Sequence, residues 1–182
     1  ENKGECLVYR IALLDDETEE LNKTIQILDK YESEHTESAF EIECFKSAEQ
    51  FLNQIADEQY APDLIIMDIY MPDKMGIDVA RQLRGMGNNC RIIFLTTSKE
   101  HALDAFAVEA TQYLLKPVSE ERIVPVLDRI MEENEEARRK YLLLRIDGRI
   151  RRVSVNDIAY CEAQGKLQYL YFADGSNCVL RV

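Results

Sequence analysis

Hydrophobic positions in the first two-thirds of the chain alternate between short apolar runs and stripes with helical spacing. The runs predict strands at Tyr9–Leu14, Phe40–Phe45, Leu64–Met67, Arg91–Leu95 and Tyr113–Leu115. Stripes between and after them predict helices, and they consist of Leu21, Ile25, Leu28, then Phe51, Leu52, Ile55, then Val79, Ala80, Leu83, then Leu103, Ala105, Phe106, and finally Ile123, Val126, Leu127 and Ile130. Repeated strand–helix units predict an α/β domain with a doubly wound, five-stranded parallel sheet and helices on both faces.

The pattern changes near residue 140. Met131–Lys140 is charged and favours helix, which suits a helical continuation or a linker. Short β-rich segments follow, at Leu142–Ile146, Arg149–Val153, Ala159–Ala163, Leu167–Phe172 and Cys178–Val182. Asp147-Gly148 and Asp174-Gly175 are hairpin signals between them. We therefore predict a first domain over residues 7–133, a linker over 134–140, and a partial all-β unit over 141–182 that is short for an independent core and suggests a truncated domain.

Polar side chains follow the predicted strands, at the sheet edge where ligands of doubly wound folds bind. Asp15 and Asp16 follow the first strand, Asp68 the third, Thr96 the fourth and Lys116 the fifth. Clustered carboxylates repel one another unless a cation is bound, and Mg²⁺ binds oxygen ligands of this kind. A carboxylate can accept a phosphoryl group as an acyl phosphate, with a metal and a lysine neutralising the transferred charge. The residue types thus predict phosphoryl transfer to Asp68.

Each of these residues also has a simpler interpretation when taken alone. An aspartate between a strand and a helix is commonly a helix cap. Taken alone, Lys116 could be an ordinary surface lysine, Thr96 an ordinary loop residue and Tyr113 a residue of the hydrophobic core. All the positions together favour a site over capping.

Four segments carry a family resemblance. They are DDE (Asp15–Glu17), MDIYMPDKMGID (Met67–Asp78), FLTTS (Phe94–Ser98) and YLLKP (Tyr113–Pro117), and they occur in this order within residues 9–131. Together they resemble the receiver domains of bacterial two-component response regulators. The resemblance implies a flavodoxin-like fold of the CheY type.

The resemblance also implies roles for single residues. Asp68 would be the phosphorylation site, and Asp15, Asp16, Asp68 and the backbone carbonyl of Tyr70 would hold Mg²⁺ (or Mn²⁺). Lys116 would contact the phosphoryl group, Thr96 and Tyr113 would form a switch pair, and Pro117 would follow a cis peptide bond. Tyr70 occupies a position where the family varies and where side chains influence dephosphorylation. A bulky aromatic ring there is expected to shield the phosphoryl group from water.

A narrower resemblance concerns the LytTR subfamily. Ala105–Ile123 is similar to receivers of that subfamily, and Val155–Lys166 is similar to the start of its DNA-binding domain. In that domain, loops between short strands enter successive major grooves, which implies base contacts by Lys166 and Gln168. The family's other contact segments would follow Val182, so this chain alone is expected to bind DNA poorly.

Charge and composition add limits to this picture. The net charge is −12, but residues 140–182 contain seven Lys/Arg and four Asp/Glu, whereas residues 1–139 contain 15 and 30. An acidic body would repel nucleic acid and a basic tail would approach phosphates, although an ordinary solvated surface explains the same charges equally well. The five cysteines lack metal-ligand spacing, which favours reduced thiols in a cytoplasmic protein. No apolar run is long enough to span a membrane, and His35 and His101 are expected on the surface.

We therefore expect a phosphorylation-controlled transcription regulator. A sensor histidine kinase would donate the phosphoryl group, the protein would homodimerise on phosphorylation, and the complete C-terminal domain would bind DNA. Beyond Mg-dependent self-phosphorylation and autodephosphorylation, no enzyme activity is expected. One alternative is a signalling adapter that acts through protein contacts without DNA. A second is an aspartyl phosphatase, which usually has another aspartate two residues after the nucleophile, where this chain has Tyr70.

Overall fold

The computed structural model describes residues 7–35, 38–56, 60–146, 149–165 and 167–181. The chain divides into two compact units, residues 1–126 and 127–182. The predicted linker, residues 134–140, lies within the long helix α5 (Glu120–Lys140). The helical alternative for this segment is therefore the one observed, while the predicted domain boundaries stay predictions.

A five-stranded parallel sheet forms the centre of the first unit. Its strands are β1 (Leu7–Leu14), β2 (Ser38–Phe45), β3 (Leu64–Met67), β4 (Arg91–Thr96) and β5 (Gln112–Leu115). Their order in the sheet is β2-β1-β3-β4-β5. From β1 the chain adds β2 on one side of the sheet, and then β3, β4 and β5 on the other side. The carboxyl ends of β1 and β3 therefore lie side by side at the point where the chain changes sides, which is where such folds bind ligands. The predicted fold class is confirmed.

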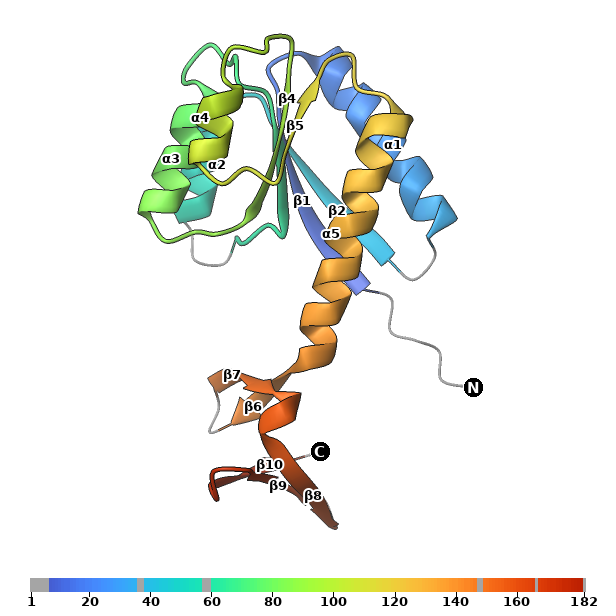
Figure 1. Cartoon of the computed structure of the whole chain (residues 1–182), viewed down its shortest axis with the longest axis vertical. Coiled ribbons are helices and arrows are strands. Elements are labelled where there is room, and N and C mark those ends of the chain that lie inside the picture. The colour runs from blue at the N-terminus through green and yellow to red at the C-terminus, as the bar shows by residue number, and fades with distance from the viewer. Residues whose placement is uncertain (1–6, 36–37, 57–59, 147–148, 166, 182) are drawn as a thin grey trace. The chain divides into compact units, whose positions relative to one another are not determined.

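Helices cover both faces of this sheet. They are α1 (Thr18–Glu34), α2 (Ala48–Ala56), α3 (Gly76–Gly85), α4 (Ala102–Ala107) and the first part of α5. Figure 1 shows α2, α3 and α4 on one face, with α1 and the start of α5 on the other. Because side chains alternate along a strand, β3 sends Ile65 and Met67 into the core on the α2–α4 side and Leu64 and Ile66 to the opposite side. Burial on both faces explains why this strand is entirely apolar.

The stripe predicted for the fourth helix is wrong in two of its three positions. Ala105 is buried, but Leu103 and Phe106 are each 85% exposed. The helix has only six residues, and the small side chain of Ala105 together with Val108 provides its buried contacts. Two large apolar side chains are thus left on the surface of the first unit.

Antiparallel strands make up the second unit after α5. β6 (Tyr141–Ile146) pairs with β7 (Arg149–Ser154), and a separate sheet has the order β10-β9-β8. The latter contains β8 (Ile158–Gln164), β9 (Leu167–Phe172) and β10 (Asn177–Arg181), and a 3₁₀ turn at Val155–Asp157 precedes it. Gly175 in the β9–β10 turn has a φ of 84°, a conformation that glycine adopts without strain. Asp147 and Gly148 lie outside the described residues.

No helix in the described part of the chain has the length and hydrophobicity that a bilayer crossing requires.

Candidate functional site

Main-chain hydrogen bonds place three charged residues at one edge of the sheet. Asp15, Asp68 and Lys116 each come directly after the last residue of a strand. Their N–H groups donate to Phe45 O (3.0 Å), Leu14 O (2.9 Å) and Thr96 O (2.8 Å), which are the last carbonyls of the neighbouring strands. The parallel ladder thus extends one residue past each strand, and regular sheet geometry fixes the three backbones.

The Lys116 ammonium bridges the two carboxylates. Its Nζ donates to Asp15 Oδ2 at 2.6 Å and to Asp68 Oδ2 at 2.7 Å. The three side chains are between 5% and 8% exposed. Two negative charges therefore face one positive charge in a poorly solvated place, and the remaining charge of about −1 favours a further cation.

The second oxygen of each carboxylate is held by the main chain. Glu17 N donates to Asp15 Oδ1 at 2.9 Å, and Tyr70 N donates to Asp68 Oδ1 at 3.2 Å. Gly76 packs against the same loop: its N–H donates to Ile69 O at 2.8 Å, and a Cβ at this position would lie 2.3 Å from Asp68 O. Only glycine allows this approach without displacing the backbone of Asp68.

Burial and ion pairing act in opposite directions on the charges. Burial raises the pKa of Asp15, and the Lys116 hydrogen bond opposes that effect without cancelling it. Burial alone would lower the pKa of Lys116, but hydrogen bonds to Asp15 and Asp68 more than offset it and leave the pKa raised. Lys116 is therefore a permanent cation at neutral pH. The Lys116–Pro117 peptide bond is cis.

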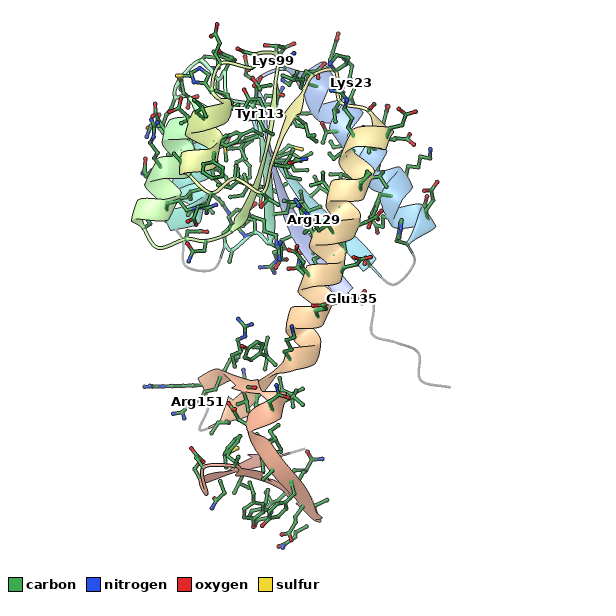
Figure 2. The ribbon with its side chains drawn as sticks, in the orientation of Figure 1. Lys23, Lys99, Tyr113, Arg129, Glu135 and Arg151 are labelled. Atoms are coloured by element: carbon green, nitrogen blue, oxygen red, sulfur yellow. The ribbon has the colours of Figure 1, made fainter. Side chains whose placement is uncertain are left out.

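Thr96 and Tyr113 lie on the neighbouring strands β4 and β5, where Tyr113 pairs with Phe94 and Thr96 with Leu115. Thr96 is fully buried at the end of β4. Tyr113 on β5 is partly buried on the α4 side of the sheet, and its hydroxyl donates to Ser98 O at 2.6 Å. Figure 2 labels Tyr113 and Lys99, the latter in the segment that follows β4. Tyr113 thus holds the β4–α4 segment, whereas its role as a switch stays a prediction.

Two of the three predicted carboxylates converge. Asp16 is exposed, and among the described residues no group of three His, Cys, Asp or Glu is arranged to hold a metal ion. The oxygen ligands that the structure brings together are the carboxylates of Asp15 and Asp68. Mg²⁺ fits such a set, because it commonly takes one or two carboxylates and completes its shell with waters and substrate oxygens. The metal role of Asp16 and of the Tyr70 carbonyl stays a prediction.

His101 is a site neighbour that the sequence interpretation missed. Its ring lies edge-to-face with Tyr70, with centroids 5.6 Å apart and an interplanar angle of 65°. Its Nδ1 lies 3.2 Å from Asp104 Oδ2. An isolated histidine 31 positions after Tyr70 has no local pattern that would reveal this contact. Only the approach of the β3–α3 and β4–α4 loops brings the two rings together.

The predicted DNA-contacting residues belong to the second unit. Lys166 lies outside the described residues. Gln168 was expected in a loop, but it lies within β9, paired with Ala163 on one side and Leu180 on the other. Its neighbours Leu167 and Tyr169 continue the apolar pattern of that strand, which is why the loop ends before it.

Comparisons with known proteins identify relatives of the first unit. The family described as "Response regulator receiver domain" matches residues 11–128. The solved response regulatory domain of the protein MrkE from Klebsiella pneumoniae is similar, with a TM-score of 0.62 and 26% sequence identity over 70% of this chain and 98% of that one.

Similarity to curated proteins extends to the second unit. "Sensory transduction protein LytT" of Oceanobacillus iheyensis is 31% identical over 134 residues, which cover 70% of this chain and 54% of the relative. The protein of the same description from Bacillus subtilis is 30% identical over 162 residues, covering 84% of this chain and 64% of the relative. The chain therefore spans between about half and two-thirds of the length of these relatives.

Proposed function

This chain belongs to the response regulator receiver domain family, and from that premise we propose that Asp68 is its phosphoryl acceptor. The observation that carries the proposal is the bridge from Lys116 to Asp15 and Asp68 at adjoining strand ends. It supplies a buried carboxylate nucleophile and, beside it, a permanent positive charge. Phosphoryl transfer depends mainly on such positioning and charge neutralisation.

In the proposed reaction, an oxygen of the Asp68 carboxylate forms a bond to phosphorus. The bond between phosphorus and the donor's leaving atom breaks, and that atom keeps the electron pair; in a phosphohistidine of a sensor kinase it is an imidazole nitrogen. Lys116 then exchanges Asp68 Oδ2 for a phosphoryl oxygen while Asp15 continues to hold it. The Thr96 hydroxyl, at the end of β4, then donates a hydrogen bond to the phosphoryl group. When bound by Asp15 and Asp68, Mg²⁺ supplies further neutralisation of the phosphoryl charge.

The output proposed for the whole protein is control of transcription in the cytoplasm. This proposal is supported by similarity to LytT proteins over both units and by the antiparallel, arginine-rich β6–β7 pair. Phosphorylation would favour homodimers, and Leu103 and Phe106, exposed on α4, support a protein contact there. The same surface also suits the adapter alternative. Apart from self-phosphorylation and autodephosphorylation, the proposal includes no catalysis.

Intact-mass spectrometry after incubation with acetyl phosphate and Mg²⁺ tests the acceptor. The wild type is expected to gain one phosphoryl group and Asp68→Asn none. Asp73→Asn is the matched control, because it makes the same chemical change in the same loop on an exposed aspartate that does not contact Lys116, and it should label like the wild type. Undiminished labelling of Asp68→Asn would refute the proposal.

A further inference from the structure

We propose that His101 is a positioning residue that holds the Tyr70 ring beside the acceptor carboxylate and so slows loss of the phosphoryl group from Asp68. The inference rests on the proposed function and adds a residue to it. His101 touches neither Asp68 nor Lys116 among the described contacts. Its effect therefore has to pass through Tyr70.

Tyr70 is tied to the acceptor at one end and to His101 at the other. Its N–H donates to Asp68 Oδ1 at 3.2 Å, so its backbone moves with the carboxylate. Tyr70 is 39% exposed, so its side chain is in contact with solvent. The edge-to-face contact with His101 is the one ring contact of Tyr70 among the described residues. Without it, the Tyr70 ring loses a lateral contact that favours one rotamer.

His101 is itself held by charged side chains from two helices. Its Nδ1 lies 3.2 Å from Asp104 Oδ2 in α4. The other carboxylate oxygen of Asp104 accepts a bond of 2.8 Å from Arg81 in α3. Arg81 in turn donates to Asp78 at 3.0 Å. A chain of contacts that begins in α3 therefore sets the orientation of the His101 imidazole. The His101 side chain is only 24% exposed.

A fixed ring beside Asp68 has a chemical consequence. Hydrolysis of an acyl phosphate requires a water molecule to approach the phosphorus from the side opposite the aspartate oxygen. The Asp68 carboxylate is only 7% exposed, and the partly exposed Tyr70 is joined to it by a main-chain hydrogen bond. A Tyr70 ring that stays in place blocks part of that approach, whereas a freely rotating ring opens it.

The test measures decay of the phosphorylated protein after the donor is removed, in Mg²⁺ buffer, by intact-mass spectrometry. Tyr70→Ala and His101→Ala should each decay about twofold to tenfold faster than the wild type, the range that corresponds to loss of one aromatic pair contact. His101→Phe, which keeps a ring, should return the rate to within about twofold of the wild type. Met86→Ala, an exposed change at the C-terminal end of α3, should leave it unaltered.

The double variant separates positioning from other effects. Because His101 acts through Tyr70, His101→Ala should add nothing in the Tyr70→Ala background. A wild-type rate for His101→Ala, or an undiminished effect of that change when Tyr70 is already Ala, would overturn the inference. If His101→Ala fails to fold, His101→Gln takes its place. Failure of the wild type to take up phosphate is a different result, and it would refute the proposed function itself.

Discussion

Lys116 donates a hydrogen bond to Asp15 that is as short as its bond to the acceptor, 2.6 Å against 2.7 Å. Asp15 therefore has a role besides its predicted one in metal binding. It keeps the Lys116 ammonium in place when the hydrogen bond from Lys116 to Asp68 is exchanged for one to the phosphoryl group. The three side chains also form a buried cluster of two negative charges and one positive charge. Removing the positive charge should therefore affect the stability of the protein.

Replacing Lys116 with Ala should destabilise the protein at neutral pH by about 3 kcal/mol, because two buried carboxylates are left facing each other. The deficit should shrink as the pH falls, since burial raises the pKa of Asp15 and the variant lacks the Lys116 hydrogen bond that opposes this rise. It should also shrink on adding Mg²⁺. Urea unfolding at several pH values measures this. Lys23→Ala, which removes an exposed lysine paired with Glu20, is the control, and an equal loss in both variants would contradict the account.

Gly76→Ala tests the close approach to Asp68. Because the new Cβ would lie 2.3 Å from Asp68 O, we expect a loss of about 1–3 kcal/mol and slower phosphorylation of the displaced carboxylate. Gly85→Ala, in the same helix with nothing within 4 Å of the added atom, is the matched control. It should be neutral or slightly stabilising, since alanine favours helix over glycine. Equal behaviour of the two variants would show that Gly76 does not constrain the loop.

Asp73 stabilises the start of α2 from the β3–α3 loop. Its Oδ2 accepts bonds from Ser47 Oγ (2.8 Å) and Glu49 N (2.9 Å), which outweigh the effect of burial and lower the pKa to about 2. Since the folded pKa is depressed, the contribution is present above the ordinary aspartate pKa and is lost as the pH falls towards 2. Asp73→Ala should therefore cost about 1 kcal/mol at neutral pH and less in acid. Asp73→Asn keeps the acceptor oxygen and should retain most of the stability without the pH dependence, as thermal unfolding across pH would show.

The exposed pair on α4 predicts an association. Replacing Leu103 and Phe106 with Ala should leave the monomer's stability unchanged, because both side chains are 85% exposed. It should weaken dimerisation of the protein activated with beryllofluoride and Mg²⁺ by about tenfold or more, the scale of an apolar interface anchor. Analytical ultracentrifugation measures both states. Met86→Ala, another exposed apolar change, serves as the control, and unaltered dimerisation of the α4 variant would exclude this surface.

Local pattern alone predicted much of the fold. The predicted bounds of β3 match the observed ones. A strand buried on both faces needs apolar side chains at every position, and the four apolar residues between Asp63 and Asp68 are the only run there that meets this need. The site followed from topology, since parallel strands carry the residues after them to one edge. The hydrophobic pattern gave a wrong prediction for the short helix α4. Leu103 and Phe106 were predicted to be buried, but their residue types do not reveal that α4 is too short to pack them against the sheet.

Contacts between loops were beyond the reach of the sequence. The meeting of Tyr70 with His101 depends on the relative placement of two loops, and the cap that Asp73 provides to α2 joins residues 26 positions apart. No local periodicity encodes either one. Asp16 is exposed, and its predicted metal role stays a prediction.

Chemical trapping of the acyl phosphate tests the identity of the acceptor most directly. After phosphorylation with acetyl phosphate and Mg²⁺, borohydride reduces an aspartyl phosphate to homoserine, which peptide mapping locates. We predict homoserine at position 68, dependent on the donor and absent when it is omitted. Conversion at position 15 or 16 instead, or phosphorylated protein with no reducible aspartyl phosphate, would contradict the account.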